Sequence, residues 1–476
     1  MSNSALTPEP VAGGTVPAGS AKPATRTGGL LLAVIYITAL FFIWAFVTNL
    51  IDPLVKSMKV IYTLSDAEAQ LNQFAFFIGY GIMSIPSGAY LAKHGYAKSI
   101  ILGLSGIVAG CLIAWSTTYS HTFITVLLGL FVAASGITLL QVAANPLIAS
   151  MGDPKRAAFR LNLSQAFNSM GAFLGGIFGS KFLLHGPLFE KNVEITDVMK
   201  ATGLGFVTNV YLTVAGILAL FTLAVFLVRN TITSNSPKMA AHKESPFSAF
   251  KSKWANLGSL GIFLYVGAEV CVISGMIFFL EQPEIMNIPS QVAGFVGPVF
   301  MLLAMFGRFI GSWLMTFVKA TTMLTLVALG AAILSIIVIA TYHLPATPLG
   351  FTVPFPTFPG VYHAPVTAGF LPGVAAILIG LFNSIMFPTI FTLTLERSTA
   401  PASATSGLMC MAISGGGFIS VVYGFAVDRF LAHFSVGARS LAFVVPLICY
   451  LYVLWFSRAA RRAQTHVIEE GVGAGH

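Results

Sequence analysis

The chain has 476 residues, of which 56% are hydrophobic and only 9% are charged, with 25 Lys and Arg against 16 Asp and Glu. Soluble domains carry about 25% charged residues, so this composition excludes a soluble globular protein and indicates a polytopic protein embedded in a lipid bilayer. The basic residues lie in short connections rather than in one patch, which argues against nucleic acid as a partner. The four cysteines fall inside apolar runs without CxxC spacing, so we expect neither disulfides nor a zinc site.

Twelve apolar runs are long enough to cross a bilayer, which takes about 20 residues per helix. They predict transmembrane helices at about 30–55, 68–92, 98–117, 121–150, 161–184, 205–229, 256–280, 292–316, 320–342, 370–395, 405–430 and 437–457. Most Lys and Arg residues fall in connections on the same side as both chain ends, which predicts cytoplasmic termini by the positive-inside rule. We therefore expect an all-α, multi-pass protein of a bacterial inner membrane, acting as a monomer.

A long polar insertion divides the twelve spans into two sets of six. The predicted organisation is a disordered cytoplasmic tail at 1–28, a six-helix bundle at 29–230, a cytoplasmic linker at 231–254, a second bundle at 255–458 and a cytoplasmic tail at 459–476. The first tail is rich in Pro, Ala, Gly, Ser and Thr, which bury too little apolar surface to become ordered. The first apolar run continues to Asp52, so it is read as a retained span rather than a signal peptide.

The two halves repeat short sequence features in the same order along the chain, as two-half transporters do. The corresponding pairs are Gly88 with Gly311, Gln141 with Asn383, and the Gly-rich stretches that begin at Asn168 and Ile413. The glycines from Gly415 onward are expected to allow close packing or bending of the eleventh span. The Pro-rich and aromatic connection at 344–366 should lie outside, either as a plain surface loop or as a cover over the outer mouth.

Asp52 is the first candidate functional residue, because an ionisable side chain at membrane depth is costly unless it faces a cavity. It follows Thr48 and Asn49 near the end of the first predicted span. The alternative is that Asp52 lies just outside the hydrocarbon and helps Pro53 to end the helix.

Most other polar side chains inside the spans are amides, which donate and accept hydrogen bonds together and so suit a neutral, polyhydroxylated ligand such as a sugar. The candidate substrate-binding residues are Asn49, Gln73, Gln141, Gln165, Asn168, Glu269, Asn383 and Phe387. An aromatic ring such as Phe387 would cover the apolar face of a sugar ring. The alternative is that buried amides simply hold helices together; for Asn145, satisfying backbone freed by Pro146 is the competing role.

Glu269 is the second candidate, since it lies near the middle of the seventh span without a Lys or Arg in that span. It either stays protonated, which includes a pure packing role, or is neutralised by a cation or a positive partner. Arg308, in the eighth span, is expected to snorkel or to pin the two halves together rather than to bind substrate.

Two rival classes of function share some of these features. A membrane-embedded enzyme would need a catalytic constellation, yet the His residues lie mainly in loops and tails, and neither a metal-binding pair nor a nucleophile elbow occurs. We therefore predict that the protein is not an enzyme. A proton-driven exporter of hydrophobic compounds would have the same architecture, but it would need an apolar cavity rather than a set of amides.

Several sequence strings together resemble the fucose permease family of the major facilitator superfamily, especially its glucose/galactose permease branch. These strings are WAFVTNLIDP, GYGIMSIPSG, QVAANP, FRLNLSQAFNSMG, YVGAEV, GRFIGSWL, NSIMFPTIF and SGGGFIS, and the similarity extends over about 30–457. The resemblance implies the major facilitator fold: twelve helices in two pseudo-symmetric six-helix bundles. It also implies a central sugar site, alternating access and coupling to an inward cation gradient.

The resemblance also suggests roles for single residues. Asp52 matches the aspartate that the fucose permease uses in proton coupling and sugar binding, and Asn49 matches the polar residue one turn earlier. Gln165 and Asn168 match amides that line the cavity, and Phe387 stands where that permease has a tyrosine.

Gln141 departs from the family pattern, because the fucose permease has a protonatable glutamate there and glutamine cannot titrate. Glu269 is a possible replacement carboxylate; alternatively, Asp52 could form a sodium site with amide oxygens of Gln141, Asn145 or Asn49. The predicted cation-coupling residues are therefore Asp52, Gln141, Asn145 and Glu269. The glucose/galactose branch is associated with sodium, which favours sodium over a proton.

The resulting prediction is a cation-coupled importer of a glucose- or galactose-like hexose, with no cofactor other than a bound sodium ion. A proton-coupled symporter of fucose or another sugar is the main alternative.

Overall fold

A computed structural model of the protein describes residues 24–64, 66–183, 196–237, 245, 247–293, 296–341, 348–357, 360–431, 433–434 and 437–465. Inside these ranges the side chains of some residues lie outside the description, among them 50–57 and 66–74. Of the predicted tails, 1–23 and 466–476 lie outside the described residues, whereas the first helix already begins at Ala24. The predicted domain boundaries stay a prediction.

The first half of the chain forms long helices that run back and forth across the molecule. They are α1 (Ala24–Ile61), α2 (Asp66–His94), α3 (Tyr96–Trp115), α4 (Thr117–Ser120), α5 (Phe123–Ser150), η1 (Pro154–Arg156), α6 (Ala157–Leu183), α7 (Asp197–Leu227) and α8 (Arg229–Asn235). Pro86 and Pro146 lie inside α2 and α5 without ending them. Tight membrane packing allows such prolines, since neighbouring helices satisfy the freed backbone groups.

The second half repeats this arrangement with two of its spans broken. Its elements are η3 (Ser248–Lys251), α9 (Lys253–Leu280), α10 (Ser290–Ala293), α11 (Val296–Leu314), α12 (Ala320–Ala340), β1 (Pro348–Thr357), β2 (Gly360–Thr367), α13 (Phe370–Asn383), α14 (Met386–Leu395), α15 (Ala402–Met411), η4 (Ala412–Ser414), α16 (Gly415–Leu431), α17 (Ala438–Leu441) and α18 (Val444–Arg462). The tenth predicted span is α13 plus α14, and the eleventh is α15, η4 and α16.

Ten stretches of the described chain are long and apolar enough to cross a membrane, from Gly29–Asn49 to Ala438–Arg462. Two more helices occupy predicted spans: α11, which contributes the shorter apolar segment Val299–Leu314, and α6, which carries several amides. A helix therefore occupies every one of the twelve predicted spans.

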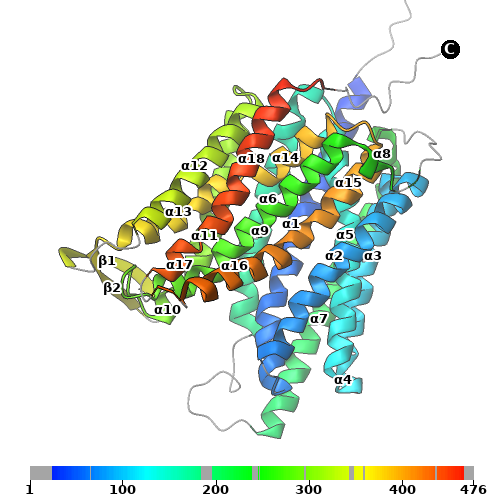
Figure 1. The fold of residues 1–476 in the computed structure, drawn as a ribbon. Helices are drawn as coiled ribbons and strands as arrows, with labels where there is room; N and C mark the ends of the chain where they lie inside the picture. The colour runs from blue at the N-terminus through cyan, green and yellow to red at the C-terminus, as the bar shows by residue number, and fades with distance from the viewer. Residues whose placement is uncertain are drawn as a thin grey trace, which may run out of the picture.

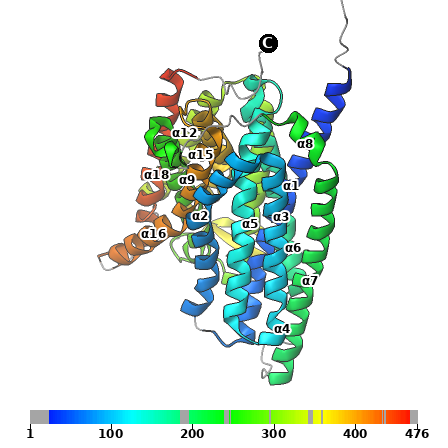
Figure 2. The same ribbon diagram turned by 90° about the vertical axis from the view of Figure 1, so that its right-hand side faces the viewer.

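The two ends of the molecule differ (Figure 1). Both α8 and the last turn of α18 lie at one end, called here the terminal end, and β1 and β2 lie at the other, called the hairpin end. In the two views the helices of the first and second halves lie beside each other, and their ribbons diverge toward the hairpin end (Figure 2).

The predicted loop at 344–366 contains an antiparallel hairpin, in which Val353 pairs with Ala364. The hairpin packs on the second half: Ala364 is fully buried and the Thr367 hydroxyl donates a hydrogen bond to the carbonyl of Ile285, 3.3 Å away. A plain surface loop would lack this packing. A role in covering the mouth stays a prediction, and 342–347 and 358–359 lie outside the described residues.

Glycines bring equivalent helix pairs close together in the two halves. A Cβ added at Gly171 of α6 would lie 2.2 Å from the carbonyl oxygen of Phe42 on α1, and one at Gly415 of α16 would lie 2.2 Å from that of Phe263 on α9. Only glycine allows such a close approach. The prediction that Gly415 permits close packing is confirmed, and the 3₁₀ segment η4 directly before it interrupts the eleventh span.

Candidate functional site

The backbone of α1 passes through Asp52 and Pro53 without a break and ends at Ile61. The interpretation that Pro53 ends this helix is therefore wrong, because a proline near a helix end can be accommodated within a longer helix. Asp52 lies three residues beyond the apolar segment Gly29–Asn49. Its side chain and that of Gln73 on α2 lie outside the described residues, so their predicted roles stay predictions.

Asn49 and Thr48 fold their side chains back onto α1. The Asn49 amide nitrogen donates to the carbonyl of Ala45 at 2.8 Å, and the Thr48 hydroxyl donates to that of Trp44 at 2.8 Å. These bonds fix the orientation of the Asn49 side chain, which is half-buried. What Asn49 has left to offer a ligand is mainly its acceptor oxygen.

Gln141 of α5 is held by Tyr80 of α2. Its amide nitrogen donates to the Tyr80 hydroxyl at 2.6 Å, and Tyr80 is buried. The glutamine is half-buried and again keeps an oxygen as its remaining acceptor. A residue predicted for cation coupling is thus oriented by a neighbour that the sequence analysis did not single out.

Gln165 and Asn168 lie three residues apart on α6, and so on one helical face. The Asn168 amide nitrogen donates to the carbonyl of Phe41 on α1 at 3.1 Å, so this amide takes part in helix packing. Gln165 is 6% exposed, and its backbone carbonyl accepts a hydrogen bond from the second half of the chain. A role of either side chain in the cavity stays a prediction.

Asn145 of α5 is fully buried where the first half meets α15 of the second half. It lies against the Cys410 thiol, but neither of its amide atoms makes a hydrogen bond of acceptable geometry with the described residues. It therefore does not satisfy the backbone freed by Pro146 in this conformation. Close by, the Ser406 hydroxyl of α15 donates to the carbonyl of Val142 at 2.8 Å.

A second polar cluster lies inside the second half, around Glu269 of α9. The Glu269 carboxylate lies near enough to the positive charge of Arg308 on α11 and to the Tyr265 hydroxyl for an electrostatic interaction. Tyr265 also donates to the carbonyl of Asn383 at 3.1 Å. Arg308 therefore brings a positive charge near Glu269 from a neighbouring helix, and the roles predicted for Glu269 stay predictions.

Asn383 ends α13 and is fully buried beside the Tyr450 hydroxyl of α18. Within the described part of the chain, its two amide atoms and the Tyr450 hydroxyl have no hydrogen-bond partner of acceptable geometry. Phe387, on α14, is 8% exposed, and its ring centroid lies 5.9 Å from that of Phe391. In this conformation Phe387 packs in the core rather than presenting a face to a ligand.

Arg308 joins the two halves. Its guanidinium donates to the carbonyl of Ser384 at 2.8 Å within its own half, and to the carbonyl of Gln165 at 3.3 Å and the hydroxyl of Ser169 on α6. Asn162 of α6 adds a further contact between the halves, to the Thr389 hydroxyl of α14 at 3.3 Å. The expectation that Arg308 pins the halves agrees with these contacts.

Residues 32–421 match the Major Facilitator Superfamily. The chain belongs to this superfamily. A glucose/galactose transporter of Brucella abortus (strain 2308) is 34% identical over 427 residues, which cover 89% of this chain and 93% of the relative. The L-fucose-proton symporter of Escherichia coli K12 is 28% identical over 461 residues, covering 94% and 97%. These matches confirm the resemblance found in the sequence.

A solved structure of the superfamily transporter FucP, in the outward conformation, superposes with a TM-score of 0.73 at 26% identity, covering 91% of this chain and 99% of that one. This likeness confirms the predicted major facilitator fold. Membership also makes the protein a transporter rather than an enzyme. Among the described residues, no group of three His, Cys, Asp or Glu is arranged to hold a metal ion.

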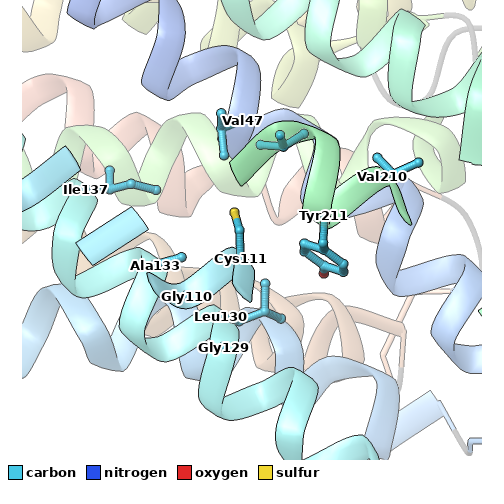
Figure 3. A pocket seen from close by; sticks show the side chains of 10 residues that line it. Val47, Gly110, Cys111, Gly129, Leu130, Ala133, Ile137, Val210 and Tyr211 are labelled. Carbon is cyan, nitrogen blue, oxygen red and sulfur yellow. The ribbon is translucent and has the colours of Figure 1, made fainter. Parts of the chain in front are cut away.

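Figure 3 shows a pocket in the first half of the chain. It lies between α1, α3, α5 and α7 of the first half, and its lining includes Val47, Cys111, Leu130, Ile137 and Tyr211. Nearly all of these groups are apolar, and none of the predicted sugar-binding residues lines it. An apolar pocket cannot orient a polyol, so we do not assign it to the substrate.

Sequence reasoning missed several partners of the site residues. Tyr80 orients Gln141, Tyr450 lies beside Asn383, and Ser169 accepts from Arg308. Ser169 directly follows Asn168 and could have been included with the amides of that helix. Nothing in the apolar context of Tyr80 or Tyr450 indicated their role.

Proposed function

We propose that this protein is a cation-coupled importer of a glucose- or galactose-like hexose that works by alternating access. The observation that carries the proposal is the similarity, over 89% of the chain, to a glucose/galactose transporter at 34% identity. The side chains support it, because helices of both halves contribute buried or half-buried amides and few fixed charges, as a neutral polyol requires.

The coupling cation is proposed to be sodium. At position 141 the chain has a glutamine, which cannot titrate and whose amide nitrogen donates to Tyr80, and Glu269 lies near the positive charge of Arg308. Because Gln141 cannot titrate and Glu269 lies beside a positive charge, Asp52 is the carboxylate that we assign to coupling. The ion would be held by Asp52 together with amide oxygens of Asn49, Gln141 or Asn145, since hard cations take oxygen ligands.

Transport then follows from charge and differential affinity. Sodium neutralises Asp52 while the site is open to the outside, which makes the chamber favourable for sugar, and the halves rock to open the other side. Loss of sodium inside restores the buried charge and favours release, because coupling needs only different affinities in the two states. A membrane potential contributes about 2.3 kcal/mol per charge per 100 mV to entry.

The terminal end is proposed to face the cytoplasm of a bacterial cell, with the hairpin end outside and the protein acting as a monomer in the inner membrane. Arg461 and Arg462 support this orientation, because they lie in the last turn of α18, at the terminal end.

Uptake by proteoliposomes tests the proposal. With an inward sodium gradient at fixed pH, labelled glucose or galactose should accumulate, and replacing sodium with choline should abolish accumulation. Asp52→Asn should abolish sodium-driven accumulation. It should leave facilitated diffusion of the sugar down its own concentration gradient intact. Accumulation by Asp52→Asn equal to that of the unaltered protein would remove the coupling assignment.

A proton-coupled fucose symporter is the second candidate, supported by the 28% identity to the L-fucose-proton symporter over 94% of this chain. The same vesicles separate the two candidates. Accumulation of fucose driven by a pH gradient in choline medium, with no response to sodium, would favour the second over the first.

A further inference from the structure

Arg308 makes contacts in this conformation that cannot survive a separation of the two halves. The guanidinium reaches from α11 to the carbonyl of Gln165 and the hydroxyl of Ser169, both on α6. Its remaining described hydrogen bond, to Ser384, lies within its own half. Opening the terminal end would move α6 away from α11 and break the two contacts to α6.

A guanidinium carries a permanent charge and five donors, and leaving it unpaired inside a membrane protein is costly. The three acceptors named above are neutral, so they satisfy donors without cancelling the charge. The carboxylate of Glu269, on α9 of the same half, lies near Arg308, so it would stay close to the guanidinium after the halves separate. It is the natural partner for the released guanidinium.

We propose that Arg308 is a latch that exchanges partners during transport: Gln165 and Ser169 hold it while the terminal end is closed, and Glu269 pairs with it once that end opens. Ser169 and Glu269 then act on the conformational equilibrium in opposite directions. Ser169 favours the closed terminal end, and Glu269 favours the open one. The latch depends on alternating access but not on the identity of the sugar or the ion.

The protein contains its own reporter for this equilibrium. Cys410 of α15 is fully buried, against Asn145 of the first half. A thiol reagent can reach it only when α15 and α5 separate. With Cys111, Cys271 and Cys449 replaced by alanine, the rate of Cys410 alkylation by N-ethylmaleimide follows the population open at the terminal end.

The test compares the alkylation rates of the detergent-solubilised protein variants, measured without sugar and, because no membrane separates two compartments, without any ion gradient. Ser169→Ala should label about tenfold faster than the parent, because it removes a hydrogen bond to a charged donor. Ser169→Thr keeps the hydroxyl and should label at the parental rate. Glu269→Gln should label about tenfold more slowly, and Glu269→Asp, which keeps the charge, should recover part of the parental rate.

Ser164→Ala is the matched control on α6, since the Ser164 hydroxyl bonds Thr38 within the first half at 3.1 Å; it should label like the parent. Size-exclusion chromatography verifies that each variant is folded.

Equal rates for Ser169→Ala and the parent would overturn the latch, as would faster labelling of Glu269→Gln, which would indicate general loosening. The Ser169 pair decides the proposal even if the Glu269 variants fail to fold. Sugar uptake is not part of the readout, so failure of the latch is distinguishable from failure of the proposed importer function.

Discussion

Asn383 combines complete burial with an amide that lacks a hydrogen-bond partner among the described residues. A buried unpaired polar group costs about 1–3 kcal/mol, so its presence needs an explanation. In a transporter, a group of this kind fits a ligand or water that it meets in another state of the cycle. Stability given up at such a position is a common feature of functional sites.

Asn383→Leu should therefore raise stability and lower transport. We expect unfolding to become less favourable by about 1–3 kcal/mol, because the apolar side chain removes an unpaired amide, while hexose uptake falls at least tenfold. Thermal unfolding in detergent and vesicle uptake measure the two effects. Tyr450→Phe, which removes the neighbouring hydroxyl, is the control. Full uptake by Asn383→Leu would remove this residue from the predicted substrate set.

Gln141→Glu introduces the carboxyl group that the fucose permease has at this position. The contact with Tyr80 can persist, since the hydroxyl can donate to a carboxylate in place of accepting from the amide. We expect uptake to become dependent on pH and less dependent on sodium, as measured by uptake at several pH values with and without sodium. Tyr80→Phe separates the effect of the contact from that of titration. An unchanged ion response would mean that position 141 has no part in coupling.

Helix pairing at the scale of single elements depends on a few glycines. Gly171 allows α6 to touch α1, and Gly415 does the same for α16 and α9 in the second half. The internal repeat in the sequence thus has a packing counterpart, since equivalent helix pairs use the same contact between a glycine and a backbone carbonyl.

Gly171→Ala should destabilise the protein by about 1–3 kcal/mol, because the new Cβ would lie 2.2 Å from the Phe42 carbonyl oxygen and force the helices apart. Gly176→Ala, on the same helix, is the matched control, since its Cβ would meet no described atom within 4 Å. It should be neutral or slightly stabilising. Thermal unfolding of both variants tests this, and equal unfolding temperatures would contradict the packing argument.

The molecule as a whole is joined across its two halves near the terminal end. Besides the Arg308 contacts, α2 and α15 approach so closely that a Cβ at Gly88 would lie 2.8 Å from the Ser403 carbonyl oxygen. The halves can therefore meet there only while position 88 lacks a side chain. At this contact between α2 and α15, the backbone of Gly88 packs directly against the backbone of Ser403.

Gly88→Ala should shift the molecule toward the state that is open at the terminal end. Alkylation of Cys410 should accelerate several-fold, because the closed contact is sterically penalised and the open one is not. Gly81→Ala, also on α2, has no described atom within 4 Å of its Cβ and should label at the parental rate. Slower labelling of Gly88→Ala would show that this contact does not close the terminal end.

Much of the fold was predictable because membrane insertion depends on local properties of the chain. Ten stretches of the described chain are apolar runs of the required length, so most spans could be located without knowing their neighbours. Two finer features were not visible in this way. The 3₁₀ segment η4 interrupts the eleventh span, and the hairpin of β1 and β2 forms where a loop was predicted. Both depend on how distant segments pack.

The sequence by itself determined the membrane class, the number of spans and the superfamily, because hydropathy and short motifs need no spatial information. Only the tertiary structure decided which partner each polar residue meets. Arg308 lies 143 residues from Gln165 and yet bonds to it, and Gln141 lies 61 residues from Tyr80. The physical reason is that a buried polar group must find its partner among the helices that surround it, and the packing of both halves sets that neighbourhood.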